Sequence, residues 1–349
     1  MSNKCFDLLY DHYSRGSARE THLWLAGEAL TIPVECNLFN SDNNVVLSNR
    51  WPKSQNNQKN FVFNDCDLSV VFNQWPVSRI YAAIPKEKAQ LNFILNQAAQ
   101  FLPEGGCFLL AGTKNQGIKS VAKNAKALFG QADSQKYGNL YLITLVKTHS
   151  SINTDTLLDD QQYSSTRAIF DINDKAVYSK PGVFGWNKID PGSELLLSCL
   201  KDTLSTYVDR SIPVLDLGCG YGYLILSAAE LGFTQLFATD NNAAALQALE
   251  QNTSVNSLNI QFWPDHIGQN TDKKFDLVLC NPPFHQGFEH DKTLTAEFTQ
   301  QMAKLTSGTG KALVVTNQFI GIEAIAKGYF THVTELKRSN GFKVVELKR

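Results

Sequence analysis

Residues 212–222 read IPVLDLGCGYG, and this stretch decides how we expect the chain to fold. An apolar run ends in Asp216, and three glycines at alternate positions lead into the helical stretch 223–230. The order of strand, glycine turn and helix is typical of nucleotide-binding α/β proteins, because glycines let the backbone approach a ligand and the amides at a helix start favour a polar or anionic group. Dinucleotide sites use G-x-G-x-x-G, but the third residue after Gly220 is Tyr223, so a different ligand is expected. A glycine triplet alone is also compatible with an ordinary tight turn.

Acidic residues follow the next two apolar runs. The run 235–239 ends at Asp240, where an acid at the end of a second strand suits the two hydroxyls of a ribose. The run 260–263 leads to Asp265 and His266, which we expect beside an adenine edge. An acid in this position can instead cap the next helix, and for Asp265 this alternative stays open.

The glycine spacing after an acid resembles the first motif of class I methyltransferases, in which the acid helps to anchor the methionine end of S-adenosylmethionine. This resemblance makes S-adenosylmethionine the expected cofactor. The candidate cofactor-binding residues all lie at strand ends or directly after them: Asp216, Gly218, Cys219, Gly220, Gly222, Asp240, Asn241, Asp265, His266 and Asn281.

The most specific signal is Asn281-Pro282-Pro283-Phe284, directly after the apolar run 275–280. Two prolines fix the backbone and remove two amide donors, so carbonyl oxygens and the Asn side-chain oxygen are left as acceptors. An exocyclic amine has two hydrogens, and holding both favours a pyramidal nitrogen whose lone pair faces a sulfonium methyl. Asn281, Pro282 and Phe284 are therefore the expected catalytic residues, with Phe284 stacking on a base. The tripeptide N-P-P alone is also an ordinary turn at a strand end.

The length of the chain predicts two globular domains, because 349 residues exceed the roughly 100–200 of one domain. No stretch approaches the roughly 18 consecutive apolar residues that a membrane span needs, and the first residues lack the apolar run of a signal peptide, so we expect a cytoplasmic protein. The seven cysteines are scattered and include no C-x-x-C pair. We expect reduced thiols, with neither a disulfide framework nor a metal site.

Charge is unevenly distributed between the halves. Residues 1–150 carry 15 Lys and Arg against 11 Asp and Glu, whereas residues 151–349 carry 17 against 22. Within the basic half, Lys119, Lys123 and Lys126 have the spacing of one helix face. Such lysines are typical of a solvated helix face, and the alternative is a patch that contacts RNA phosphates.

The two halves show a faint internal repeat. IYAAIP at 80–85 is similar to LVLCNPP at 277–283, GGCFLLAG at 105–112 to GTGKALVVTN at 308–317, and GNLYLITLVK at 138–147 to GFKVVELKR at 341–349. The offsets are each about 200 residues, which indicates duplication of one α/β unit. The first half lacks a glycine-rich turn, with no glycine between Thr31 and Phe72, so the first copy is expected to be catalytically silent. A polar segment after Val146 is expected to link the domains.

Four stretches together resemble the bacterial ribosomal RNA small-subunit guanine-N2 methyltransferase C family. They are the glycine motif, NPPFHQG at 281–287, PGVFGWNKIDPGSELLL at 181–197 and the closing NGFKVVELKR. The segment 75–95, WPVSRIYAAIPKEKAQLNFIL, is similar to the first domain of that family, so the resemblance covers nearly the whole chain. The family usually has W-P-K where this chain has Trp75-Pro76-Val77, which puts in doubt how the first domain meets RNA.

The resemblance implies an α/β fold of two tandem Rossmann-like class I methyltransferase domains. Residues 1–150 would form a degenerate domain for RNA binding and structural support, and residues 165–349 the catalytic domain, with a seven-stranded, mostly parallel sheet. The implied substrate is guanine 1207 in helix 34 of 16S ribosomal RNA, either as free RNA or within the assembled 30S subunit, and we expect a monomer. Phe184, His285 and the three lysines above are candidate substrate-binding residues, with His285 expected to matter less than Asn281.

Three other functions stay open. The related large-subunit 23S guanine-N2 methyltransferase shares N-P-P-F-H and the tandem layout. Protein-glutamine N-methyltransferases use N-P-P-Y, because an amide nitrogen poses the same chemical problem. A protein of another class, an RNA-binding ribosome assembly factor without catalysis, is disfavoured by the intact NPPF motif.

Overall fold

The computed structural model describes residues 1–349 with the exception of 1, 16–19, 34, 54–58, 207–208 and 284–287. The chain divides into two compact units, Met1–Arg50 with Ser54–Ser165 and Trp51–Lys53 with Thr166–Arg349. The polar segment after Val146 belongs to the first unit up to Ser165, where the hydroxyl of buried Tyr163 donates to Asp65 Oδ1 at 2.9 Å. No helix among the described residues is long and apolar enough to cross a membrane.

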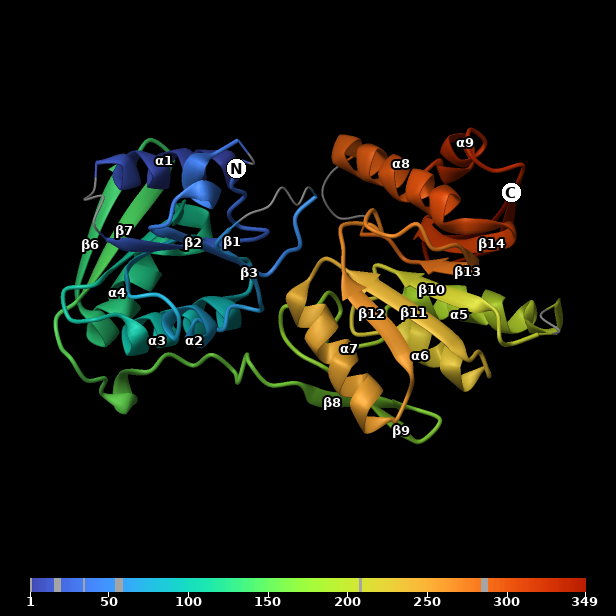
Figure 1. Ribbon diagram of the computed structural model, residues 1–349, viewed down its shortest axis with the longest axis horizontal. Helices are drawn as coiled ribbons and strands as arrows, with labels where there is room; N and C mark the ends of the chain where they lie inside the picture. Colours follow the sequence, from blue (N-terminus) through green and yellow to red (C-terminus); the bar gives the residue numbers. More distant parts are fainter. Residues whose placement is uncertain (1, 16–19, 34, 54–58, 207–208, 284–287) are drawn as a thin grey trace. The chain divides into compact units, whose positions relative to one another are not determined.

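Each unit contains one seven-stranded sheet, and the two sheets have the same strand order (Figure 1). The first sheet runs β3-β2-β1-β4-β5-β7-β6 and the second β12-β11-β10-β13-β14-β16-β15. In each sheet one strand, β7 or β16, pairs antiparallel with both neighbours. The strands of the first sheet are β1 Thr21–Ala26, β2 Asn44–Ser48, β3 Phe61–Phe63, β4 Val77–Ala83, β5 Cys107–Thr113, β6 Gly130–Tyr137 and β7 Leu140–Lys147. Those of the second are β10 Pro213–Leu217, β11 Gln235–Asp240, β12 Ile260–Pro264, β13 Phe275–Cys280, β14 Thr306–Asn317, β15 His332–Ser339 and β16 Phe342–Lys348.

The shared order confirms the two tandem Rossmann-like domains that the sequence predicts. The three pairs of similar segments correspond to β4 and β13, β5 and β14, and β7 and β16, which hold the same places in the two sheets. The expected seven-stranded, mostly parallel sheet of the second unit is confirmed, and the first unit has such a sheet as well.

The second sheet is covered on both faces by helices. Figure 1 shows α8 Phe288–Leu305 and α9 Ile322–Ala326 on one face, and α5 Pro191–Asp202, α6 Tyr223–Glu230 and α7 Ala243–Val255 on the other. Parallel strands buried on both faces read as continuous apolar runs, as β13 does with Leu277, Val278 and Leu279 all buried. A two-stranded hairpin, β8 Arg167–Ile172 and β9 Lys175–Ser179, precedes α5 and contacts α7.

The first sheet also has helices on both faces, but among the described residues it has fewer α-helices than the second sheet. Helix α1, Ser2–Ser14, packs on one face, and α2 Ser69–Phe72, α3 Lys88–Phe101 and α4 Ile118–Phe129 lie on the other (Figure 1). Between β1 and β2 the described residues form only the short 3-10 helix Asn37–Asn40, where the second unit has α6. Aromatic side chains fill the α1 face, with Trp24 and Tyr81 stacked at 4.4 Å between ring centroids.

Candidate active site

The glycine turn joins β10 to α6 in a backbone conformation that favours glycine. Gly218 and Gly222 have φ values of 80° and 97°, which residues with a Cβ rarely adopt. A Cβ on Gly222 would lie 2.6 Å from Leu249 Cδ1, so α7 packs closely against the turn. Around Gly218 the nearest side-chain atom to such a Cβ is 3.8 Å away, on Phe298. The turn is therefore tightly packed at Gly222, whereas the described residues leave room for a Cβ at Gly218.

Asp216, at the end of β10, is almost fully buried with 1% of its surface exposed. Its Oδ2 accepts a hydrogen bond from the Ile225 amide at 3.1 Å, whereas Oδ1 has no hydrogen-bond partner among the described residues. Burial raises the pKa of this carboxyl to about 8, the Ile225 amide acts in the opposite direction, and the charge of Asp240 adds to the increase. A buried carboxyl with an unsatisfied oxygen is suited to a cationic ligand group, because a nearby positive charge stabilises the carboxylate.

Asp240 ends β11 beside the glycine turn, as the strand order requires. Its Oδ2 accepts from the Gly220 amide at 2.8 Å and its Oδ1 from the Asn242 amide at 2.8 Å. Asn241 directly follows the acid and is half-buried. The structure thus brings the first two acids and the glycine turn together at the carboxyl end of the sheet, where this class of fold binds ligands.

Asp265 follows β12 and is buried with 1% exposure. Its two oxygens accept from the amides of Gln269 and Asn270, from the Asn270 side chain and from the Trp263 indole, at 2.9 to 3.3 Å. A carboxylate has about four acceptor positions, and these four donors occupy them, three of them from the following loop. The contact of Asp265 with adenine stays a prediction. Neighbouring His266 is half-buried, its Nε2 has no partner among the described residues, and burial lowers its pKa.

Asn281 follows β13 at the centre of the carboxyl edge. Cys280 pairs with Leu217, so Asn281 lies beside Gly218 on the adjacent strand. The Asn281 side-chain nitrogen donates to Asp190 Oδ2 at 2.7 Å and to Ser193 Oγ at 2.8 Å. Pro282 is buried directly after it. Phe284 and His285 lie outside the described residues.

Two asparagines on α7 and just before it were not identified from the sequence. Asn252 is fully buried, and its side chain accepts from the Tyr178 amide and donates to the carbonyls of Tyr178 and Tyr221. Asn242 caps α7 through Ala244 and donates to the Gly182 carbonyl at 2.8 Å. They fix the glycine turn and the segment before α5. An N-cap pattern identifies Asn242, whereas no local signal identifies Asn252.

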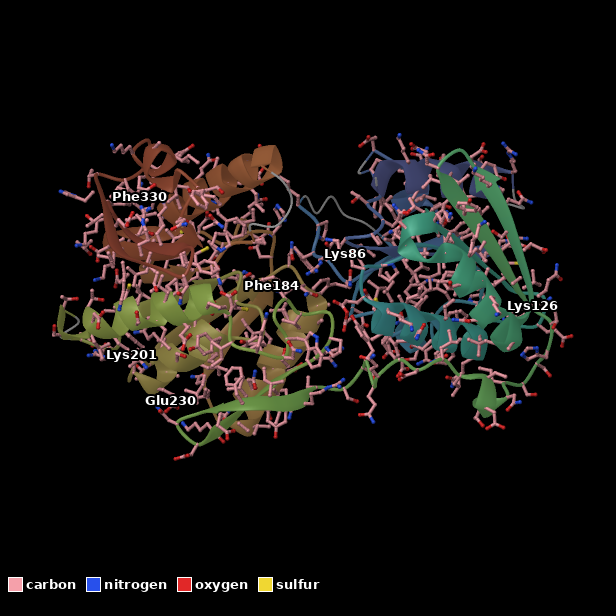
Figure 2. The ribbon with its side chains drawn as sticks, turned by 180° about the vertical axis from the view of Figure 1, so that it is seen from behind. Lys86, Lys126, Phe184, Lys201, Glu230 and Phe330 are labelled. Atoms are coloured by element: carbon pink, nitrogen blue, oxygen red, sulfur yellow. The ribbon has the colours of Figure 1, made fainter. Side chains whose placement is uncertain are left out.

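Phe184 lies in the segment that joins β9 to α5 and is labelled in Figure 2. Its side chain is 66% exposed and is therefore accessible at the surface. Because the Gly182 carbonyl accepts from the Asn242 side chain, the segment is held to the same edge of the sheet as Asp240. The position is compatible with the predicted substrate contact.

Lys119, Lys123 and Lys126 lie on α4 of the first unit, as the spacing predicts. All three are exposed, while Ile118, Ala125, Leu128 and Phe129 of the same helix are buried. Figure 2 shows Lys126 at the outer margin of this unit. Lys119 Nζ lies 5.3 Å from the centroid of the Tyr141 ring. The structure therefore presents a basic helix face, and its contact with RNA stays a prediction.

The edge of the first sheet that corresponds to the glycine turn has different chemistry. Gly27 follows β1, and a Cβ on it would meet Asn49 Oδ1 at 2.2 Å, so a side chain covers the turn. Glu28 forms ion pairs with Arg50 and Lys86, which follow β2 and β4. The corresponding turn thus lies at 27–29, before the glycine-free stretch 31–72, and it keeps one glycine. Helix α6, which begins at the glycine turn, has no α-helical counterpart among the described residues between β1 and β2.

The sheet order, the glycine turn after an acid and the asparagine-proline motif after the fourth core strand define a class I, S-adenosylmethionine-dependent methyltransferase. The profile of the methyltransferase small domain matches residues 174–346, and that of the methyltransferase small domain N-terminal region matches 19–160. The chain belongs to the ribosomal RNA small subunit methyltransferase C family.

Two relatives with this name show the extent of the similarity. The protein of Mannheimia succiniciproducens is 30% identical over 282 residues, which cover 80% of this chain and 80% of the relative. That of Haemophilus influenzae strain 86-028NP is 30% identical over 269 residues, covering 75% and 77%. The solved structure of the T. thermophilus 16S rRNA N2 G1207 methyltransferase, in complex with AdoMet and guanosine, is 23% identical, matches with a TM-score of 0.76, and covers 98% of this chain and 91% of that chain. This structural match extends the shared fold over both units.

Proposed function

We propose that this chain transfers a methyl group from S-adenosylmethionine to the N2 amine of a guanine in 16S ribosomal RNA of the 30S subunit. The nucleotide that we propose is the one named for the T. thermophilus protein, G1207. The observation that carries the proposal is the orientation of Asn281, whose nitrogen is bound by Asp190 and Ser193, so that its oxygen is presented as an acceptor. Because the substrate is part of the ribosome, the cytoplasm is the proposed compartment.

The cofactor fits the residues at the carboxyl edge. S-adenosylmethionine, when bound, supplies an electrophilic methyl group on a positively charged sulfur. Asp216 would hold the methionine end through its unsatisfied Oδ1, and Asp240 would bind the ribose hydroxyls. The described residues leave room beside Gly218 for close approach. Further proposed contacts come from Cys219, Gly220, Gly222, Asn241, Asp265 and His266.

The residues of the proposed base site act by positioning the guanine amine. Asn281 Oδ1 and the Pro282 carbonyl each accept one hydrogen of the guanine N2 amine, and the nitrogen lone pair then faces the methyl carbon. Phe284 is proposed from the sequence alone to stack on the base. No general base is required, because the amine becomes cationic on transfer and its extra proton leaves to water. His285 is therefore expected to contribute less than Asn281.

The test compares Asn281→Ala with His285→Ala in single-turnover methylation of unmethylated 30S subunits. Loss of a preorganised hydrogen-bond acceptor is expected to lower the methyl-transfer rate by roughly two to three orders of magnitude, with cofactor affinity nearly unchanged. His285→Ala is the comparison variant, and it is expected to lower the rate less than Asn281→Ala does. Equal losses in both variants, or a wild-type rate in Asn281→Ala, would contradict the proposed activation.

Mapping the methylated position identifies the substrate. Modification of guanine N2 in 16S RNA supports the proposal, whereas modification of 23S RNA or of a protein glutamine would replace it with a related activity. RNA binding without methylation in the presence of S-adenosylmethionine would make the chain an assembly factor. Sedimentation of the active protein tests the proposed monomer.

A further inference from the structure

Asp190 lies 91 residues before Asn281, yet its carboxylate is the direct partner of the Asn281 amide. Asp190 is the N-cap of α5, and its Oδ2 accepts from the Ser193 amide at 2.9 Å as well as from Asn281 Nδ2 at 2.7 Å. Ser193 Oγ accepts from the same Asn281 nitrogen at 2.8 Å, so both amide hydrogens of Asn281 have partners. One helix start therefore holds the nitrogen side of this amide.

The chemistry of the two groups decides the orientation of the amide. An ionised carboxylate only accepts hydrogen bonds, so Asp190 can bind the nitrogen of Asn281 but repels its oxygen. A side-chain amide rotated by about 180° would place two oxygens against each other and would present a donor, not an acceptor, on the opposite side. An amine donor of the substrate would then meet another donor.

We propose that Asp190, together with Ser193, is a positioning residue that selects the orientation of Asn281 in which the oxygen faces the substrate amine. The inference rests on the proposed function of Asn281. Neither residue touches the reacting atoms, because both are bonded to the far side of the amide. Their hydrogen bonds to the Asn281 nitrogen hold the Asn281 oxygen in position before the substrate binds, so the acceptor is preorganised.

The packing around the start of α5 constrains the position of the Asp190 carboxylate. A Cβ on Gly192 would lie 3.0 Å from Asp190 Oδ2 and 3.1 Å from Phe342 Cδ1, so a side chain at this position would crowd both the carboxylate and the Phe342 ring of β16. Pro191 at the first helical position fixes the chain after the cap. Ser193 is buried, with 8% exposure.

The test is a double-mutant cycle of Asp190→Asn and Asn281→Asp in the full-length protein. Asp190→Asn keeps the cap, because Asn and Asp cap helices about equally well, but it removes the charge that rejects the Asn281 oxygen. We expect a roughly ten- to hundredfold lower single-turnover rate, the scale of a lost charge-assisted hydrogen bond, with unchanged cofactor affinity and thermal midpoint. Asn281→Asp places two carboxylates in contact and is expected to lose more.

The double variant is the decisive arm, because it reverses the polarity of the pair. The new amide at position 190 can donate to the new carboxylate at position 281, whose other oxygen faces the amine, but the nitrogen then occupies the position that accepts from the Ser193 amide, so this variant gives up that cap bond. We expect Asp190→Asn/Asn281→Asp to be at least tenfold faster than Asn281→Asp alone. Additive effects, or a wild-type rate in Asp190→Asn, would overturn the proposal. Ser193→Ala is a second variant, expected to lower the rate less than Asp190→Asn.

A readout independent of activity separates this inference from the proposed function. The side-chain amide protons of Asn281, observed by nuclear magnetic resonance, should exchange slowly in the wild type and rapidly in Asp190→Asn. If the Asn281 amide protons of the wild type exchange slowly but no guanine is methylated, the proposed orientation of Asn281 stands and the proposed substrate is wrong. Equally fast exchange in both proteins would reject the orientation, whatever the substrate.

Discussion

Oδ2 of Asp240 accepts a hydrogen bond from the backbone amide of Gly220 at 2.8 Å, so the acid that ends β11 holds the glycine turn that follows β10. The other oxygen of the same carboxylate accepts from the Asn242 amide at the start of α7. One side chain thereby joins two neighbouring strand ends. A change at Asp240 should affect the shape of the turn as well as any ligand bound beside it.

We first predict that Asp240→Ala weakens the binding of S-adenosylmethionine. Loss of a charged acceptor for the ribose hydroxyls costs about 1.5–3 kcal/mol, which raises Kd by roughly ten- to hundredfold. Titration calorimetry measures the change. Asp272→Ala is the control, because Asp272 is a fully exposed acid of the same unit, and its Kd should equal that of the wild type. An unchanged Kd in Asp240→Ala would place the ribose elsewhere.

The raised pKa of Asp216 predicts that the affinity for the cofactor depends on pH. Burial raises the pKa of this carboxyl to about 8, so below that pH the ligand-free protein holds a proton there. A cationic ligand group favours the carboxylate, so binding should release a proton, and affinity should rise with pH and level off above about 8. Calorimetry in buffers of different ionisation enthalpy measures the proton release. Asp216→Asn should abolish this component, and an identical release in that variant would assign the proton to another group.

The same raised pKa has a consequence for stability. The folded protein binds more protons at Asp216 than the unfolded chain between the ordinary carboxyl pKa of 3.8 and about 8. The contribution of this group to the free energy of unfolding therefore falls as pH rises through that window. In urea unfolding measured over a series of pH values, the free energy of unfolding of Asp216→Asn should not show this part of the decline.

The glycine turn and the acids could be predicted from the sequence because their signals are local. A strand end, a following acid and alternate glycines occupy a few consecutive positions, and parallel strands bring their carboxyl ends together. The partnership of Asp190 with Asn281 could not be predicted in this way. The pattern Asp-Pro-Gly-Ser indicates a helix start, but which of many donors its carboxylate binds depends on how β13 lies beside α5.

Asp265 shows a second limit of sequence analysis. An acid after β12 suits either an adenine edge or a loop, and the residue letter does not distinguish them. The structure shows three loop donors around its carboxylate because the chain turns back at Gln269 and Asn270, and the Trp263 indole of β12 is the fourth donor. The connection after β1, which contains no α-helix among its described residues, could not be predicted either, since the faint repeat matches strands and carries no information on the connections between them.

The full-length protein should bind one S-adenosylmethionine per chain. In the first unit Asn49 occupies the space beside Gly27, and Glu28 forms ion pairs with Arg50 and Lys86, so the described residues cover the corresponding turn and pair its acid. Calorimetric stoichiometry measures this, and Asp216→Asn should weaken the single binding event while Glu28→Gln leaves it unchanged. A second equivalent of cofactor bound per chain would contradict the loss of this site.

The lysine face of α4 should contribute to RNA affinity. Replacing Lys119, Lys123 and Lys126 with Gln is expected to weaken 16S RNA binding and to reduce the slope of log K against log salt by about 0.7 for each phosphate contact removed. Replacing three other exposed lysines of the unit, Lys4, Lys88 and Lys136, changes net charge equally and is the matched control. Equal slopes for the two triple variants would leave α4 as an ordinary solvated helix face.

The glycine turn allows ligand binding and stability to be separated by two similar substitutions. Gly218→Ala and Gly222→Ala each force a residue with a Cβ into positive φ, which costs about 1–2 kcal/mol. At Gly222 the new methyl also meets Leu249 at 2.6 Å, which adds about 1–3 kcal/mol of overpacking between the turn and α7. At Gly218 the methyl enters the side of the turn where we place the cofactor, so Gly218→Ala should lower cofactor affinity more than it lowers stability.

Amide hydrogen exchange in β10 and α6 reports the local stability of this unit, and calorimetry reports the affinity. If Gly218→Ala binds S-adenosylmethionine as tightly as the wild type while exchange in α6 accelerates, the Gly218 side of the turn does not receive the cofactor.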